Sequence, residues 1–292
     1  MVLMRGMISR LRKRVSEREL CQAASIGRSS IRYICKGPTQ QEQEERHAIM
    51  SLANRHRYMG TPRAKVLLER LGYFMNHKKL ERIWREECLQ VPRSKRRRRK
   101  QGTPGQLGIR AQGPNEVWCQ DFLFQRTRYG RKVKIFVLLD EFTRECLAIR
   151  VGDKLDSEDV KSVLKEVVVK RGKPRYIRSD NGSEFIAGHL QGWMGSKGIT
   201  PLYIEPGSPW QNGFIESFHG KLRKECLDRE TFGSKKEIEV VLMWWQEIYN
   251  HYRPHSALDY KTPAEMAPKG PSATLQDPWG LTSMEEKLWL LN

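Results

Sequence analysis

Three acidic residues, Asp121, Asp180 and Glu216, are the side chains of this sequence best suited to chemistry. Asp121 interrupts the apolar run QDFLF, where an ionised carboxylate is costly unless a cation compensates it. Asp180 ends another strand-like run just before the turn-forming Asn181-Gly182, and Glu216 falls in a helix-like segment. Carboxylate oxygens suit Mg²⁺ or Mn²⁺. Two such ions roughly 3.5–4 Å apart support in-line displacement at a phosphodiester.

The charge of the chain is divided unevenly along the sequence. A formal net charge of +19 favours an anionic partner, either nucleic acid or an acidic membrane surface. Residues 1–110 hold 27 of the 53 Lys and Arg but only 9 of the 34 Asp and Glu, whereas residues 111–292 are almost neutral. This division predicts a basic binding module followed by a catalytic module that carries the clustered carboxylates.

The cysteines and the apolar runs indicate the cellular compartment of the chain. Six cysteines are scattered without a disulfide pattern or zinc-ligand spacing, so reduced thiols are expected. No apolar run is long enough to span a membrane, and the basic N-terminus lacks a cleavable leader. We therefore expect a soluble cytoplasmic protein.

The elements that must position the acids follow from Asn115 onwards. The runs EVWCQDFLF, KVKIFVLLD and CLAIRVG predict three strands in an antiparallel meander. A helix capped by Asp156 or Ser157 and ended by Gly172 follows, then the strand RYIRSD, a helix around 184–196 and the strand ITPLYIE. Ser208-Pro209 predicts the start of a helix that reaches about residue 228, and Ser234–Glu237 predicts a capping box before an apolar helix. The fold class is α/β, a mixed five-stranded sheet flanked by helices.

Small helical modules are expected ahead of this sheet. Residues 16–36 predict two short helices, the second beginning near Ser29 or Ser30, as a helix-turn-helix or merely as two packed helices. Residues 42–90 predict a helix, a break at Gly72 and a helix capped by Asn76, with Leu80, Ile83 and Trp84 facing inward. The outward basic residues suit DNA or form a solvated charged face: His77, Lys78, Lys79, Arg82 and Arg85.

A dense basic run, RSKRRRRK, begins at Arg93. It opens a stretch without periodicity up to Pro114, which predicts a linker whose Arg96, Arg97, Arg98 and Arg99 bind DNA phosphates without sequence preference. The expected domains are an N-terminal helical segment (1–38), a helix-turn-helix domain (39–92), the basic linker (93–114), a catalytic core (115–270) and a C-terminal tail (271–292).

Residues near the acids allow both structural and functional interpretations. Asp140 closes a strand and either forms a turn or supports the acids, and His219 either lies on a helix surface or contacts DNA. Gly182 is expected to supply backbone freedom to the loop after Asp180. The other candidates are Asn181 and Glu184 in that loop, Trp210 and Gln211 as contacts to a base or sugar, and Arg253 and His255 as packing or phosphate-binding residues.

The segments VWCQDFLF, RSDNGSEF and SPWQNGFIESFHGKLRKE closely resemble the DDE core of transposases and retroviral integrases. The 35 residues between Asp180 and Glu216 match the Asp-35-Glu signature, and Arg223 occupies the usual basic position seven residues later. Two helical turns separate Arg223 from Glu216, so both face the same way. With VLLDEFTREC, YNHYRPHSALDYKTPAEM and YMGTPRAKVLLERLGYFMNHKKLERIWREECL, residues 40–268 are similar to OrfB-type transposases of the insertion sequence 3 family.

This resemblance implies a ribonuclease H-like fold and two Mg²⁺ ions, replaceable by Mn²⁺, on Asp121, Asp180 and Glu216. It implies hydrolysis that exposes a 3′ hydroxyl, followed by attack of that hydroxyl on another phosphodiester. The implied partners are double-stranded DNA, as terminal inverted repeats and target, and further copies of the chain, because two DNA ends must be held together. A nucleoid-associated location is expected, and Lys221 and Arg223 are expected to join the basic residues named above in binding DNA.

Three questions stay open at this level. Many members of this family act as a frameshift fusion, and this chain shows no heptad run that could be their leucine zipper, so it acts alone, with the upstream-frame product or within a fusion. A non-catalytic DNA-binding protein that keeps the fold also fits, although the intact acids weigh against it. A structure-selective nuclease would cut DNA without joining it.

Overall fold

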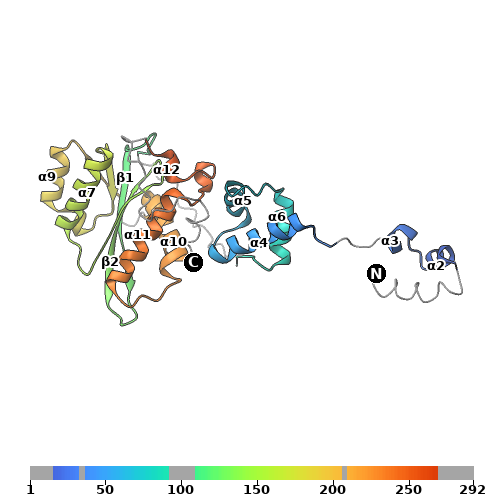
Figure 1. Ribbon diagram of the computed structural model, residues 1–292. Helices are drawn as coiled ribbons and strands as arrows, with labels where there is room; N and C mark the ends of the chain where they lie inside the picture. Colours follow the sequence, from blue (N-terminus) through green and yellow to red (C-terminus); the bar gives the residue numbers. More distant parts are fainter. Residues whose placement is uncertain (1–15, 33–36, 92–108, 206–208, 269–292) are drawn as a thin grey trace. The chain divides into compact units, whose positions relative to one another are not determined.

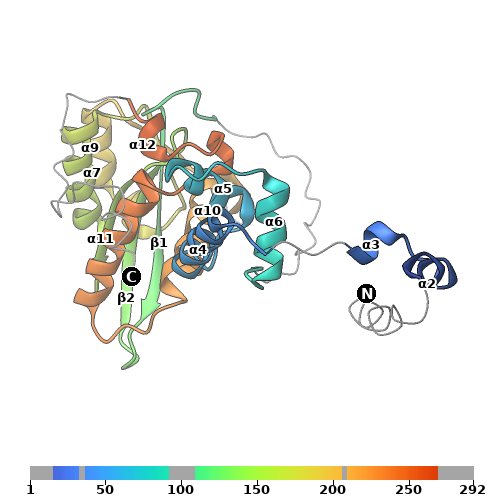
Figure 2. The ribbon, with the colours of Figure 1, turned by 45° about the vertical axis from the view of Figure 1, so that its right-hand side comes forward.

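The computed structural model describes residues 16–32, 37–91, 109–205 and 209–268. The chain divides between Ala48 and Ile49, inside α4 (Gln40–Arg55), into two compact units. In the N-terminal unit, α2 (Glu17–Ala23) begins at a capping box formed by Ser16 and Glu19, and α3 (Arg28–Arg32) follows at an angle (Figure 2). Both short helices expected over 16–36 are present, and the second begins at Arg28.

After the last part of α4, the second unit continues with the helix pair expected over 42–90. In this pair, α5 (Thr61–Arg70) packs on α6 (His77–Glu86) across a turn in which Gly72 has φ of 87°. Asn76 caps α6, since its Oδ1 accepts the N–H of Lys78 at 3.0 Å. The predicted inward side chains are all buried: Leu80, Ile83 and Trp84.

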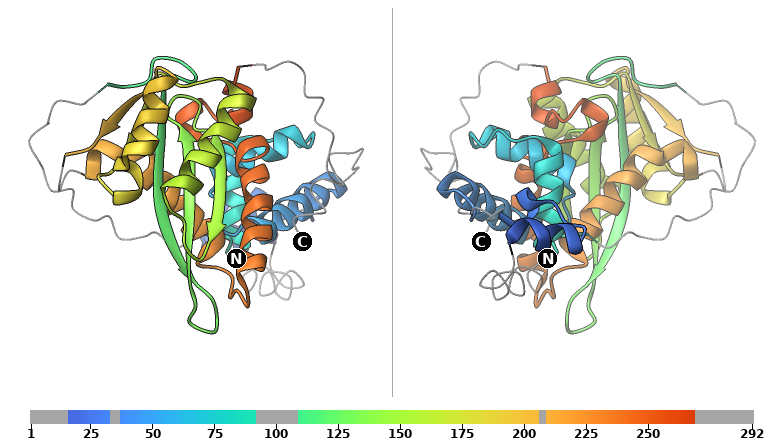
Figure 3. Two further views of the ribbon diagram at one scale, coloured as in Figure 1. Left: turned by 90° about the vertical axis from the view of Figure 1, so that its left-hand side faces the viewer. Right: turned by 90° about the vertical axis from the view of Figure 1, so that its right-hand side faces the viewer.

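A five-stranded sheet forms the rest of the second unit, in the order β3-β2-β1-β4-β5. The three long strands pair antiparallel, as the meander predicted, and β4 and β5 add parallel strands beside β1. The strands are β1 (Val117–Arg126), β2 (Lys132–Asp140), β3 (Cys146–Gly152), β4 (Tyr176–Ser179) and β5 (Thr200–Tyr203). The hairpin of β1 and β2 extends beyond the other strands (Figure 3). The mixed five-stranded sheet is therefore confirmed.

Helices cover both faces of the sheet (Figure 1). Alternate residues of β1 enter different cores: Trp118 packs with α7 (Ser157–Arg171), α8 (Ser183–Ile186) and α9 (Gly188–Ser196), and Cys119 packs with α10 (Gly213–Leu222) and α11 (Lys235–His251). Strand alternation thus separates two apolar layers. The short η3 (Ser256–Leu258) and α12 (Pro263–Met266) follow α11.

Three local predictions differ from the structure. The helix expected around 184–196 is two helices, because Ala187 adopts an extended ψ of 130° between α8 and α9. The helix expected over 208–228 has three parts: the 3₁₀ turn η1 (Pro209–Asn212), α10 and the π-helical turn η2 (Arg223–Leu227). Only half of the capping box expected at Ser234 forms, since Glu237 accepts the N–H of Gly233 at 2.6 Å instead.

The described residues contain no helix that is both long and apolar enough to cross a membrane. The five described cysteines are free thiols: Cys21, Cys88, Cys119, Cys146 and Cys226.

Candidate catalytic site

Two neighbouring parallel strands bring Asp121 and Asp180 to one part of the sheet. Cys119 of β1 pairs with Arg178 of β4, so Asp121 and Asp180 lie two residues further along each chain from that pair. Asp180 immediately follows the last residue of β4, where the chain turns away from the sheet. The register of β1 and β4 therefore places these two acids side by side.

Helix α10 brings Glu216 to the same strand. One turn after Glu216, the Nδ1 of His219 lies 3.6 Å from Oδ2 of Asp121. Beyond the helix, Nη2 of Arg223 donates to the carbonyl oxygen of Phe124 in β1 at 3.1 Å. The helix consequently runs along β1, with the face that carries Glu216, His219 and Arg223 toward this strand.

The carboxylate of Asp121 is electrostatically strained. Its pKa is raised to about 7: burial is the largest cause, and the negative charges of Asp180 and Glu216 contribute the rest of the rise. The N–H of Phe122 donates to Oδ1 at 2.7 Å and acts in the opposite direction. A half-buried carboxylate with two acidic neighbours favours either a proton or a cation.

The donor set around Asp121 fits a hard cation. Carboxylate oxygens are the ligands that Mg²⁺ takes in proteins, and a bound cation would offset the repulsion that raises the pKa of Asp121. Among the residues that the structure describes, no three His, Cys, Asp or Glu side chains are grouped closely enough to hold one ion together. Asp180 and Glu216 are thus near enough to act on the charge of Asp121, but the three acids are not grouped around one point.

The loop after Asp180 is fastened by its own side chains. Oδ1 of Asp180 accepts the N–H of Gly182 at 3.0 Å, Asn181 donates to the carbonyl oxygen of Ile204 at 2.8 Å, and Glu184 pairs with Lys134. Gly182 has an ordinary φ of −60°, so the expectation of backbone freedom is wrong. Space is the reason for glycine, since a Cβ would lie 3.0 Å from Oδ1 of Asp180.

His219 lies beside Asp121 in the structure. The sequence left open whether this histidine lies on a helix surface or contacts DNA. Burial lowers the pKa of His219 to about 4, with the nearby Arg223 as a second cause, so the imidazole is neutral at pH 7. Its Nε2 is buried without a hydrogen-bond partner. Its position one turn after Glu216 was the available signal, but only the packing of α10 on β1 shows that it faces Asp121 rather than solvent.

Several neighbouring candidates have structural roles. Asp140 accepts the N–H groups of Phe142 and Thr143 in the turn after β2 and that of Asn115 ahead of β1, and none of these bonds joins it to the acids. Arg253 is 3% exposed and pairs with Glu225, at 2.7 Å from Nε and 2.5 Å from Nη2, and buried His255 lies against the carbonyl oxygen of Tyr249. Gln211 accepts the N–H of Glu205, whereas the side chain of Trp210 lies outside the described residues.

The candidate DNA-binding residues occupy different environments. On α6, Lys78 and Arg82 are exposed and Lys79 is half-buried. Lys221 donates to Ser217 at 2.9 Å, and burial lowers its pKa to about 8. Arg223 is partly exposed beside the acids. The basic run Arg96, Arg97, Arg98 and Arg99 lies outside the described residues.

Comparison with known proteins places this site within a known domain. The integrase core domain family matches residues 111–209, and a second integrase core domain family matches residues 197–263. Together they span all three acids. The similarity does not depend on the acids alone, because the two matches cover the whole sheet and the helices on both of its faces.

Whole-chain relatives agree with these matches. The uncharacterized 31.7 kDa protein of insertion element IS407 from Burkholderia multivorans is 37% identical over 87% of this chain and 91% of its own length. The transposase InsF for insertion sequence IS3A from Escherichia coli is 23% identical over 82% of this chain and 90% of its own length.

Among solved structures, the HTLV-2 integrase catalytic core domain in complex with magnesium is 20% identical, with a TM-score of 0.41, over 54% of this chain and 99% of that chain. The chain has a mixed five-stranded sheet and an integrase core, and it belongs to the DNA-cleaving and DNA-joining insertion-sequence transposases of the DDE superfamily.

Proposed function

We propose that Asp121, Asp180 and Glu216 are the catalytic acids of this transposase and together hold two Mg²⁺ ions, which Mn²⁺ can replace. The observation that carries this assignment is the convergence of the acids: Asp180 lies beside Asp121 in the β1–β4 register, and the charges of Asp180 and Glu216 add to burial in raising the pKa of Asp121 to about 7. Sheet register and the packing of α10 keep these like charges close, at a cost in stability that a bound cation removes.

The divalent ions would activate the attacking oxygen and stabilise the leaving oxygen of a phosphodiester. The chain itself supplies the positions of the ligands. The N–H of Gly182 donates to Asp180, the N–H of Phe122 donates to Asp121, and α10 with the following turn η2 carries Glu216 and Arg223 along β1. Neutral His219 leaves the negative charge of Asp121 available to a cation.

The DNA partner follows from the reaction. We propose that the terminal inverted repeats and the target DNA contact Arg223 beside the acids, Lys78, Lys79 and Arg82 on α6, and the basic run from Arg96 to Arg99. Lys221 would contribute less, because its ammonium is partly buried and bonded to Ser217. Two DNA ends must be held together, so the working form would be a dimer or larger, at the bacterial nucleoid.

The test uses the full chain with duplexes that end in the terminal inverted repeats of its element. In Mg²⁺ the parent should nick these ends and join them to a target. Glu216→Gln should reduce both steps by about 10³-fold or more while DNA affinity is retained, because one metal ligand is lost. Strand joining is measured on sequencing gels and affinity by fluorescence anisotropy.

Glu239→Gln is the matched control, since Glu239 is an exposed glutamate of α11 that pairs with Lys236. It should join DNA at the parent rate. Joining by Glu216→Gln at the parent rate would remove Glu216 from the site, and products that are cut but never joined would indicate a nuclease instead.

A further inference from the structure

A cavity of about 360 Å³ opens beside the start of α10 and is separate from the acids. Its walls come from the segment ahead of β1, the turn after β2, the first turn of α10 and the loop after α11. The polar lining residues are Arg110, Glu141, Arg144, Asp259 and Lys261. Neither the catalytic residues nor the proposed DNA-binding residues line this cavity.

Arg144 is the unusual member of this lining. Its Nε and Nη1 are buried without a hydrogen-bond partner, and its guanidinium carbon lies 3.7 Å from the ring centroid of Phe214. Burial lowers the pKa of Arg144, although the charge of Glu141 opposes this shift. Arg144 as a whole is half-buried, and N–H groups that are buried without an acceptor are costly until an acceptor binds the guanidinium.

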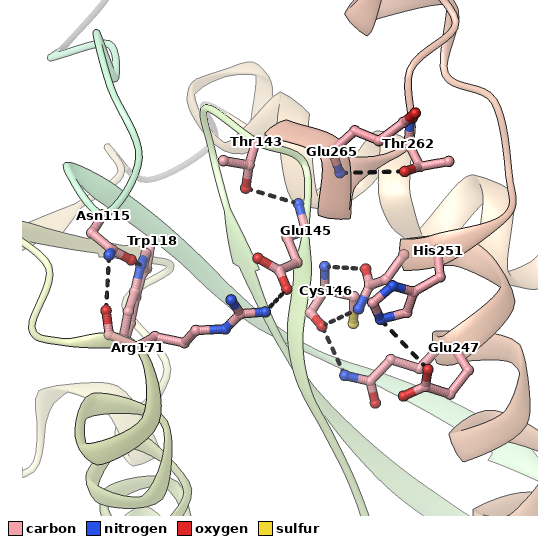
Figure 4. Close-up of polar contacts among 12 residues, drawn as sticks. Asn115, Trp118, Thr143, Glu145, Cys146, Arg171, Glu247, His251, Thr262 and Glu265 are labelled. Atoms are coloured by element: carbon pink, nitrogen blue, oxygen red, sulfur yellow. Dashed lines mark hydrogen bonds and ion pairs between the residues drawn. The ribbon is translucent and has the colours of Figure 1, made fainter. Parts of the chain in front are cut away.

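The backbone holds Arg144 in place at a further cost. Its φ of 62° lies in the left-handed region, which long side chains rarely adopt. The flanking residues fasten this turn: Glu145 donates its N–H to Thr143, and its carboxylate pairs with Arg171 (Figure 4). The N–H of Arg144 itself donates to the carbonyl oxygen of Asp140 at 3.0 Å. The guanidinium is therefore presented by a turn that backbone hydrogen bonds and an ion pair hold in place.

The charges that line the cavity leave room for an anion. The carboxylate of Glu141 already has partners, because it pairs with buried Arg178 and accepts the N–H of Ala111 at 3.4 Å. The remaining carboxylate is that of Asp259, against the cations of Arg110, Arg144 and Lys261. Arginine in such a setting favours phosphate, whose oxygens can accept two of its N–H groups at once.

Apolar side chains complete the lining, and the combination of cations with apolar surface limits the class of ligand that the cavity can bind. Phe142, Phe214, Leu258 and Met266 provide surface beside the cations. A phosphate alone would gain nothing from these walls, whereas a nucleotide has both a phosphate and a flat apolar base. Proteins that bind unpaired bases combine apolar or aromatic contacts with cations in this way.

The cavity lies close to the acids along two elements. Phe214 lies in the same turn of α10 as Glu216, although side chains two residues apart on a helix face different sides. The turn that presents Arg144 follows Asp140, which pairs with Trp118, three residues before Asp121 on β1. DNA bound at the acids would therefore reach the cavity within a short stretch of the same strand.

We propose that this cavity binds an unpaired nucleotide of the DNA substrate next to the scissile phosphate. The phosphate of this nucleotide lies on Arg144, with Arg110 and Lys261 at the rim, and its base lies against Phe142 and Leu258. Holding this nucleotide out of the base-paired duplex would keep the two DNA strands apart at the phosphodiester on which the acids act. This inference rests on the proposed function of the acids.

The test measures binding without divalent metal, so that it does not depend on catalysis. Inverted-repeat duplexes, each with one unpaired nucleotide at a different step across the cleavage site, are compared with the fully paired duplex by fluorescence anisotropy. At one or more steps the parent should bind the unpaired form about tenfold more tightly. Arg144→Gln should lose this preference, and Lys261→Gln, at an exposed position, should reduce it about threefold.

Replacing the phosphate of the unpaired nucleotide by a neutral methylphosphonate tests whether Arg144 contacts this phosphate or only supports the fold. It should weaken binding to the parent about tenfold and leave binding to Arg144→Gln unchanged. Arg150→Gln is the matched control, since Arg150 is an exposed arginine of β3 paired with Glu166, and it should behave as the parent.

Equal affinity of the parent for paired and unpaired duplexes at every step would overturn the proposal. A methylphosphonate effect of the same size in Arg144→Gln and the parent would also overturn it. Either result would leave the loss of joining in Glu216→Gln intact, so the failure of this inference is distinguishable from the failure of the catalytic assignment.

Discussion

Two aspartates of the same sheet, Asp121 in β1 and Asp140 at the end of β2, have opposite environments. Asp140 is only 2% exposed, yet the N–H groups of Asn115, Phe142 and Thr143 donate to it at 2.8–2.9 Å. The side chain of Asp121 is 26% exposed, accepts one N–H, and faces two further acids that raise its pKa to about 7.

This difference separates a structural carboxylate from a candidate catalytic one. Backbone N–H groups replace the water that Asp140 loses, so its charge holds a turn together. Asp121 gains no comparable compensation from the fold, and its environment becomes favourable only when a cation arrives. Burial alone would have marked the more deeply buried Asp140, rather than Asp121, as the carboxylate that lacks compensation.

The largest expected effect is on strand joining. Asp121→Asn should reduce joining of inverted-repeat ends in Mg²⁺ by about 10³-fold or more, because it removes a metal ligand. Asp140→Asn should keep joining within about tenfold of the parent once rates are normalised to folded protein, since Asp140 only shapes a turn. Equal losses in both variants would mean that Asp140 also acts at the site.

A second expected effect is on stability and its pH dependence. Well below pH 4 the carboxyl of Asp121 is protonated in both states, whereas above about pH 7 it is ionised in both and only the folded state bears the cost of that charge. The unfolding free energy of the metal-free parent therefore falls as pH rises from about 4 to 7, because the folded state must ionise Asp121 at this cost. Asp121→Asn escapes the loss and should be more stable than the parent by up to about 4 kcal/mol at pH 8.

Urea unfolding of both proteins in EDTA, at pH 5 and at pH 8, measures this difference. Comparing the two proteins at each pH cancels the histidines, whose lowered pKa values act in the opposite direction. A difference that does not grow between pH 5 and pH 8 would show that Asp121 is compensated in the folded state.

The smallest effect has the opposite sign. Asp140→Asn should lower the unfolding free energy by about 2 kcal/mol, because an amide accepts on one side only and presents an N–H to a backbone donor. Asp228→Asn, at an exposed aspartate, should stay within about 0.5 kcal/mol of the parent. Urea unfolding at pH 7 tests both variants, and a neutral Asp140→Asn would contradict the structural role of this turn.

Much of the fold was predictable because the physics is local. The apolar runs EVWCQDFLF and KVKIFVLLD predict strands, and Asp156 and Gly172 bound α7 through capping. The segment 184–196 was harder, since nothing in its composition marks Ala187 as the break between α8 and α9. The start of α10 was also displaced, because proline at 209 fits a 3₁₀ turn as well as an α-helix.

The sequence by itself determined the candidate acids and their spacing, the expected strands and helices, and the basic character of the first 110 residues. Only the tertiary structure decided that Asp121 lacks compensation while Asp140 has three donors, that His219 faces the acids, and that Arg144 carries orphaned N–H groups beside a cavity. The physical reason is that solvation and charge compensation depend on groups brought together from distant segments, whereas strand and helix patterns depend on near neighbours.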